Sequence, residues 1–78
     1  MTWSYRIIRH KDKYKVWYAV HEVFYHKNGK PYSVTEKPVD IIGDNQLEVK
    51  DAIFMILKDA FYYPVLDMKF FDKKKRKK

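Results

Sequence analysis

The segment at 14–26, YKVWYAVHEVFYH, constrains the fold more than any other part of the chain. Side chains two positions apart point the same way in a strand, and here both sets are largely apolar. A strand of this kind lies inside a sheet and needs cover on both faces. One of its two faces carries Trp17, Ala19, Val23 and Tyr25.

Two further strands are predicted on either side of this segment. Residues 3–10 alternate between apolar and polar types, as a half-buried strand does. The Asn28-Gly29 dipeptide follows the central segment and favours a hairpin with a type I′ turn, which needs positive φ at both positions. Residues 32–36 then return as a strand antiparallel to the central one.

A single helix is predicted to begin after Asn45. The Asn45 side chain can cap it, and Glu48 stands three residues later, as in a capping box. Apolar residues then recur at helical spacing, and Pro64 ends the helix near residues 60–62. The segment at 65–71, VLDMKFF, is short and alternating, and we expect it to form a final strand or an extended arm.

The predicted fold is therefore α+β, a three-stranded antiparallel meander with one helix packed on it. We expect residues 1–71 to form one domain, with a short fourth strand at 65–71. One helix covers only one face of a sheet, so the other face remains apolar and exposed, which is typical of an interface. We therefore predict a homodimer through this face or through a sheet edge, with the interface residues Trp17, Ala19, Val23 and Tyr25.

A run of six cations dominates the charge of the chain. Without it, 11 basic residues face 10 acidic ones, and the net charge falls from +7 to +1. We expect 72–78 to be a disordered basic tail that binds nucleic acid weakly and without sequence preference. The alternative is a tail that only keeps the protein soluble. The predicted nucleic-acid-binding residues are Lys73, Lys74, Lys75, Arg76, Lys77 and Lys78.

No residue pattern indicates catalysis, a metal or a cofactor. The chain has no cysteine, and its histidines do not have the spacing of a helical zinc site. We expect His21 to pack beside Trp17 with one ring nitrogen hydrogen-bonded. The chain also shows no signal peptide and no apolar stretch long enough to cross a bilayer, so we expect a cytoplasmic protein.

Several sequence segments resemble a group of small uncharacterised bacterial and phage proteins. They are YRIIRH at 5–10, WYAVHEVFY at 17–25, NGKPYSVTEKPV at 28–39 and PVLD at 64–67. This resemblance implies a bacterial or phage origin but no activity. The order of strands and helix is similar to the HicB-like antitoxin fold, and this likeness is one of topology alone.

Three functions fit these observations. The first is a non-enzymatic, self-associating binding protein whose basic tail attaches it to nucleic acid. The second is an accessory or inhibitor protein that docks an aromatic surface on one host protein. The third is an antitoxin-like regulator. Deleting 73–78 separates the first two, because only the first depends on the tail.

Overall fold

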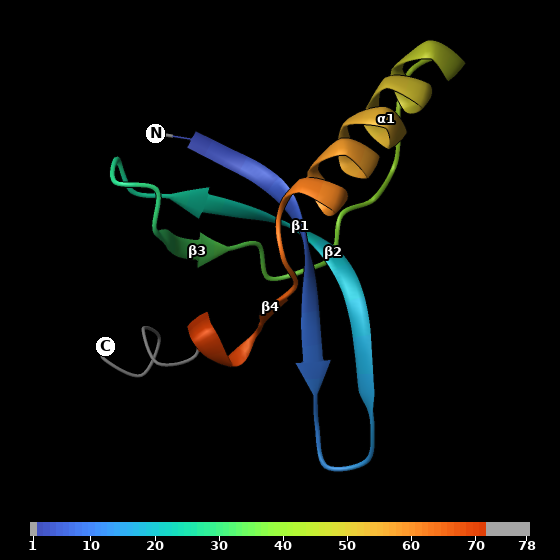
Figure 1. The fold of residues 1–78 in the computed structure, drawn as a ribbon. Helices are drawn as coiled ribbons and strands as arrows, with labels where there is room; N and C mark the ends of the chain where they lie inside the picture. The colour runs from blue at the N-terminus through green and yellow to red at the C-terminus, as the bar shows by residue number, and fades with distance from the viewer. Residues whose placement is uncertain (1, 72–78) are drawn as a thin grey trace.

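A computed structural model describes residues 2–71 and shows an α+β fold (Figure 1). Its sheet has four strands in the order β3-β2-β1-β4. Neighbouring strands are antiparallel except for β1 and β4, which are parallel. The elements are β1 (Thr2–Lys11), β2 (Val16–Tyr25), β3 (Pro31–Val34), α1 (Gln46–Tyr62) and β4 (Leu66–Asp67).

The predicted fold class is confirmed, including the meander, the helix and the short fourth strand. The ends of α1 follow the local signals in the sequence. The Asn45 side chain accepts a hydrogen bond from the Glu48 amide at 3.0 Å, and the Glu48 carboxylate accepts one from the Asp44 amide at 2.9 Å. The helix ends before Pro64, where Tyr63 is already extended.

The hairpin at Asn28-Gly29 forms, but the predicted turn type is wrong. Gly29, at φ 88°, is the only described residue with positive φ, so Asn28 does not adopt the type I′ conformation. The Gly29 amide donates to the His26 carbonyl at 2.9 Å, and the His26 amide donates to the Lys30 carbonyl at 2.9 Å. This is a three-residue loop that closes on a left-handed glycine. The Asn28 side chain accepts from the Lys30 amide instead.

The core is small and lies on one face of the β1–β2 hairpin. Ile8, Val23 and Tyr25 are buried there, and Phe71 from the C-terminal segment packs onto them. Buried Ser4 hydrogen-bonds the Tyr25 hydroxyl at 2.7 Å, so the polar atoms on this face have partners. The half-buried residues around this core are Val34, Tyr63, Leu66 and Met68.

Cover for this face therefore comes mainly from the segment at 63–71, which follows α1. The helix itself does not lie across the sheet. Its C-terminal end contacts β1, and its N-terminal end projects away from the strands (Figure 1). No residue of α1 is buried. The consequence is a helix whose sides are mostly open to other molecules.

Candidate protein-interaction surface

Helix α1 has apolar residues on two opposed sides, which is unusual for a helix that is not enclosed. A helix with this pattern is normally buried in a core. Here its apolar side chains are exposed to very different degrees, from 44% for Met55 to 85% for Phe61. The exposed apolar residues of α1 are Leu47, Ile53, Phe54, Met55, Leu57, Phe61 and Tyr62.

The amount of exposed apolar surface on α1 is large for a monomer. If each side chain of this size offers about 200 Å² when fully exposed, the exposed fractions of these seven correspond to roughly 850 Å². The largest apolar patch on a typical monomer is about 300–600 Å². A standard interface buries about 800 Å² on each partner. The four that share one side of the helix, Leu47, Phe54, Leu57 and Phe61, account for roughly 520 Å² of this area. An interface of standard size therefore also needs apolar surface beside the helix.

The apolar residues of α1 form two opposed rows. Val49, Ala52, Ile56 and Ala60 are half-buried and recur every three or four positions, so they share the side turned toward the fold. The other row is exposed and is called the outer stripe below. It consists of Leu47, Phe54, Leu57 and Phe61.

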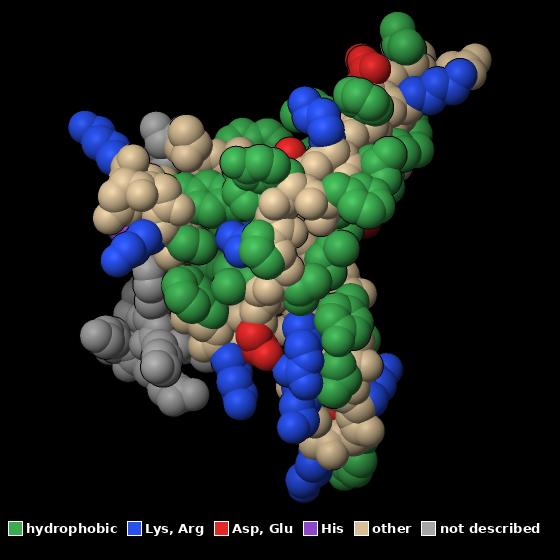
Figure 2. Space-filling view, viewed as in Figure 1, with side chains coloured by type: hydrophobic (Ala, Val, Ile, Leu, Met, Phe, Trp, Pro, Cys, Tyr) green, Lys and Arg blue, Asp and Glu red, His purple; other side chains and the backbone are tan. Residues whose placement is uncertain are grey.

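The space-filling view shows the same distribution. Apolar side chains follow α1 along the face in view, with basic and acidic side chains between them toward its projecting end, and continue over the part of the sheet beside it (Figure 2). Ile41 and Ile42, which precede the helix, add to the exposed apolar surface and are 47% and 77% exposed. Exposed apolar residues thus also precede the helix in the chain.

Two kinds of contact hold the ends of α1: a hydrogen bond at the C-terminal end and a close approach of the chain at the N-terminal end. The Asp59 carboxylate accepts a hydrogen bond from the Tyr5 amide of β1 at 3.0 Å. At the other end the chain passes close at Gly43, where an added Cβ would lie 2.8 Å from the Glu48 Cβ. Each residue of the outer stripe stays more than half exposed.

The predicted interface residues lie elsewhere, and two of the four were wrongly placed. Val23 is fully buried and Tyr25 is 5% exposed, so both belong to the core and not to an open face. Their face is the one that Phe71 and its neighbours cover. Ala19 lies opposite Ile8 and is half-buried. Of the four, Trp17 is the most exposed, at 38%.

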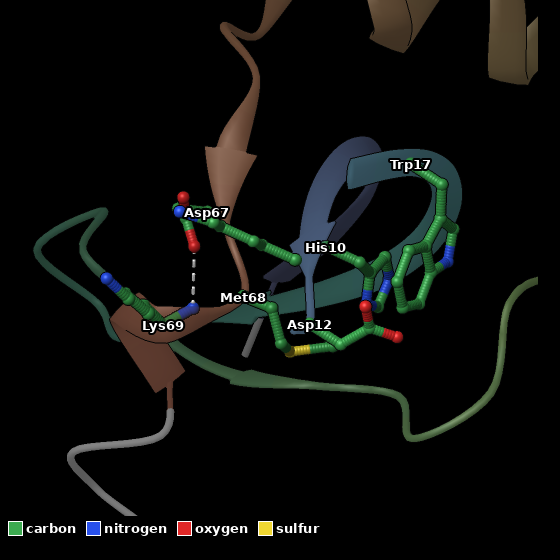
Figure 3. A pocket seen from close by; sticks show the side chains of 7 residues that line it. His10, Asp12, Trp17, Asp67, Met68 and Lys69 are labelled. Atoms are coloured by element: carbon green, nitrogen blue, oxygen red, sulfur yellow. Dashed lines mark hydrogen bonds between the residues drawn. The ribbon is translucent and has the colours of Figure 1, made fainter. Parts of the chain in front are cut away.

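Trp17 belongs instead to an aromatic and histidine stack beside a shallow pocket (Figure 3). Its indole lies parallel to the His10 ring at 5.0 Å, and the Lys15 ammonium lies 5.4 Å from the indole ring. The pocket has a volume of about 290 Å³. It is lined by His10, Lys11, Asp12, Trp17, Asp67, Met68 and Lys69.

Below this stack, His10 and His21 are joined directly. Their Nε2 atoms are 2.9 Å apart, and His21 Nδ1 lies 2.9 Å from the Thr35 carbonyl oxygen. A carbonyl only accepts, so His21 Nδ1 carries the proton and its Nε2 accepts from His10 Nε2. Burial, the main cause, lowers the pKa of His21.

Both ring nitrogens of buried His21 thus have partners, where one was predicted, and His10 rather than His21 stacks on Trp17. The β1–β2 register places His10 opposite Trp17 and Arg6 opposite His21, so the two histidines lie on the same face of the hairpin. Their side chains meet along that face. Across residues 2–71, no group of three or more potential ligands is placed to hold a metal ion. The histidine pair fixes the loop at Thr35 to the sheet.

One ion pair attaches β4 to β1. The Arg9 guanidinium and the Asp67 carboxylate are 2.7 Å apart and both are partly exposed. The Lys69 amide, followed by the Arg9 guanidinium, lowers the pKa of the Asp67 carboxyl. Neither residue was singled out from the sequence, because their contact depends on the parallel pairing of β4 with β1.

The basic run Lys73, Lys74, Lys75, Arg76, Lys77 and Lys78 lies outside the described residues, as does the rest of the predicted tail. In residues 2–71, no helix is both long and apolar enough to cross a membrane. Comparison with known proteins found no family model that matches the chain. It also found no significant similarity to a curated protein or to a solved structure.

Proposed function

We propose that this protein is a non-enzymatic interaction module that associates with itself through helix α1. One observation carries the proposal: a helix with apolar residues on two opposed sides has no buried residue. Leaving such a surface in water is unfavourable by about 25 cal/mol for each Å² of apolar area. Association removes that surface from water without any change in the sheet.

The size of the core supports the same proposal. Only Ile8, Val23, Tyr25 and Phe71 are buried apolar residues in the described part of the chain. Small domains with a core of this size are commonly stabilised by disulfides, metals or association. The chain has no cysteine, so a disulfide is excluded. A second copy then provides the apolar cover that the fold does not supply for itself.

The mass of the full chain across a concentration series tests self-association. Sedimentation velocity from about 1 to 200 μM is expected to give twice the mass of the chain at the upper end. A standard interface has a dissociation constant in or below this range. Leu57→Glu places a charge on the outer stripe and should give a monomer with an unchanged circular dichroism spectrum.

Tyr14→Glu is the matched control, because Tyr14 is 87% exposed in the β1–β2 loop, away from α1. It should leave the mass unchanged. A wild-type chain that stays monomeric across the series would refute self-association. The accessory or inhibitor function would then explain the exposed helix better, with a different protein on the same surface.

We propose a second function for the basic run at 73–78, namely attachment of the protein to nucleic acid. Six consecutive cations support it. If all six neutralise phosphates of duplex DNA, the binding constant should fall with salt with a log–log slope of roughly −5. A chain cut after Asp72 should lose this binding. Equal binding by both chains would place nucleic-acid recognition on the folded part instead.

A further inference from the structure

We infer that α1 pairs antiparallel with α1 of a second copy, through the outer stripe. This inference rests on the proposed self-association and adds its geometry. The outer stripe has the spacing of a two-helix seam, because Leu47, Phe54 and Phe61 are each seven residues apart and Leu57 follows Phe54 by three. Positions with this repeat stay on the line of contact between two paired helices.

The seam fixes which residues flank it. Asp51 and Lys58 lie on one flank, and Ile53 and Ala60 lie on the other. In a parallel pair, each flank of one helix faces the opposite kind of flank on its partner. Lys58 would then lie beside Ile53 of the second copy, and Asp51 beside Gln46. No charge pair would form, and the apolar flank would meet charged side chains.

In an antiparallel pair, like flanks meet. Centring the contact on Phe54 and Leu57 of the two copies places Asp51 beside Lys58 of the second copy, and the twofold symmetry repeats this ion pair. The same alignment places Ile53 beside Ala60 of the second copy, and Ala60, half-buried against its own fold, forms the edge of the contact. One flank is then charge-complementary and the other is apolar, so the sequence of α1 matches itself only in this direction.

The remaining seam position is occupied by Lys50. In the antiparallel alignment it lies beside Phe61 of the second copy, near the ends of the contact. A lysine there can lay its methylene chain over the aromatic ring while its ammonium group stays in water. The central layers, in which water is excluded, contain only Phe54 and Leu57.

The attachment of α1 to its sheet favours the same direction. The C-terminal end of the helix contacts β1, and the N-terminal end projects beyond the strands (Figure 1). Antiparallel pairing puts the two sheets at opposite ends of the helix pair, where each has room. It also brings Ile41 and Ile42, which precede the projecting end, toward the sheet of the second copy. Parallel pairing would crowd both sheets at one end.

Charge reversal tests the direction without altering the apolar seam. Asp51→Lys and Lys58→Asp each turn both ion pairs of an antiparallel dimer into repulsions, so each variant alone should dimerise about tenfold more weakly. Mixed together, the two variants should recover tight association as a heterodimer, because each introduced charge then meets its opposite. Native mass spectrometry separates the heterodimer from the homodimers by mass, and sedimentation gives the affinities.

Glu36→Lys is the charge-matched control, because Glu36 is exposed and lies outside α1. It should not change the dissociation constant. A wild-type dimer that Asp51→Lys leaves intact, with no heterodimer preference in the mixture, would overturn the antiparallel pairing and leave self-association standing. A wild-type chain that is monomeric would overturn both. These two results are distinguished in the same set of measurements.

Discussion

Acidification should destabilise this fold through His21, whose side chain is fully buried. In the fold His21 is neutral, with Nδ1 donating to Thr35 and Nε2 accepting from His10. A proton on Nε2 would set two N–H groups against each other, and burial also disfavours the charge. The unfolded chain has no such restraint, and its His21 binds a proton near pH 6.5.

The magnitude follows from this difference in proton binding. A base with a lowered pKa in the fold gives stability that is fully present above pH 6.5 and is lost as the pH falls. While only the unfolded state binds the proton, the loss approaches about 1.4 kcal/mol for each pH unit. Between pH 7.5 and 5.5, the free energy of unfolding should therefore fall by up to about 1.4 kcal/mol.

Urea unfolding followed by tryptophan fluorescence measures this loss. It is done at one protein concentration, because association also contributes to stability. The pH stays above 5, so that carboxylates, with usual pKa values of about 4, contribute little. His21→Gln keeps a donor for the Thr35 carbonyl but does not titrate, and it should remove most of the slope. His26→Gln, at an exposed histidine, should keep it. An equal slope in His21→Gln and wild type would refute the reasoning.

Three further substitutions test the fold, each by the urea-derived free energy of unfolding. Ile8→Ala leaves a cavity where Ile8 is fully buried in a very small core, and should cost about 2–5 kcal/mol. Asn45→Ala removes the helix cap on the Glu48 amide and should cost about 1 kcal/mol, with a small loss of helical circular dichroism. Gly43→Ala would put a Cβ 2.8 Å from the Glu48 Cβ and 3.2 Å from the Val49 amide nitrogen. It should therefore displace the helix start and cost about 1–3 kcal/mol. An unchanged midpoint in any of the three would contradict the contact on which that prediction depends.

Features that depend on neighbouring residues could be predicted from the sequence. The limits of α1 follow from Asn45 and Pro64, and the β2–β3 hairpin follows from the glycine between two strands. The turn type was missed because Asn28 tolerates either sign of φ, and its side-chain bond to the Lys30 amide favours the negative one. Local propensity does not decide between two allowed backbone states of similar energy.

The candidate surface could be predicted only in part. The sequence indicates two apolar faces on β2 and one helix, but not which segment covers which face. The covering residue is Phe71, far from Val23 in sequence, and its position depends on the parallel pairing of β4 with β1. The second apolar row of α1 is visible in the sequence as the seven-residue spacing of Leu47, Phe54 and Phe61. This row indicates an interface only when the position of α1 is known, because a helix lying across the sheet would bury part of it.

The position of Phe71 in the core has a consequence for synthesis on the ribosome. Strands β1 and β2 emerge early. The face that carries Ile8 and Val23 stays uncovered until the segment at 63–71 has left the exit tunnel. Contacts between distant parts of a chain form late and slowly. Until then Ile8 and Val23 are accessible to chaperones and to other nascent chains. The moment at which 63–71 leaves the tunnel, and not the emergence of the strands, therefore sets when this core closes.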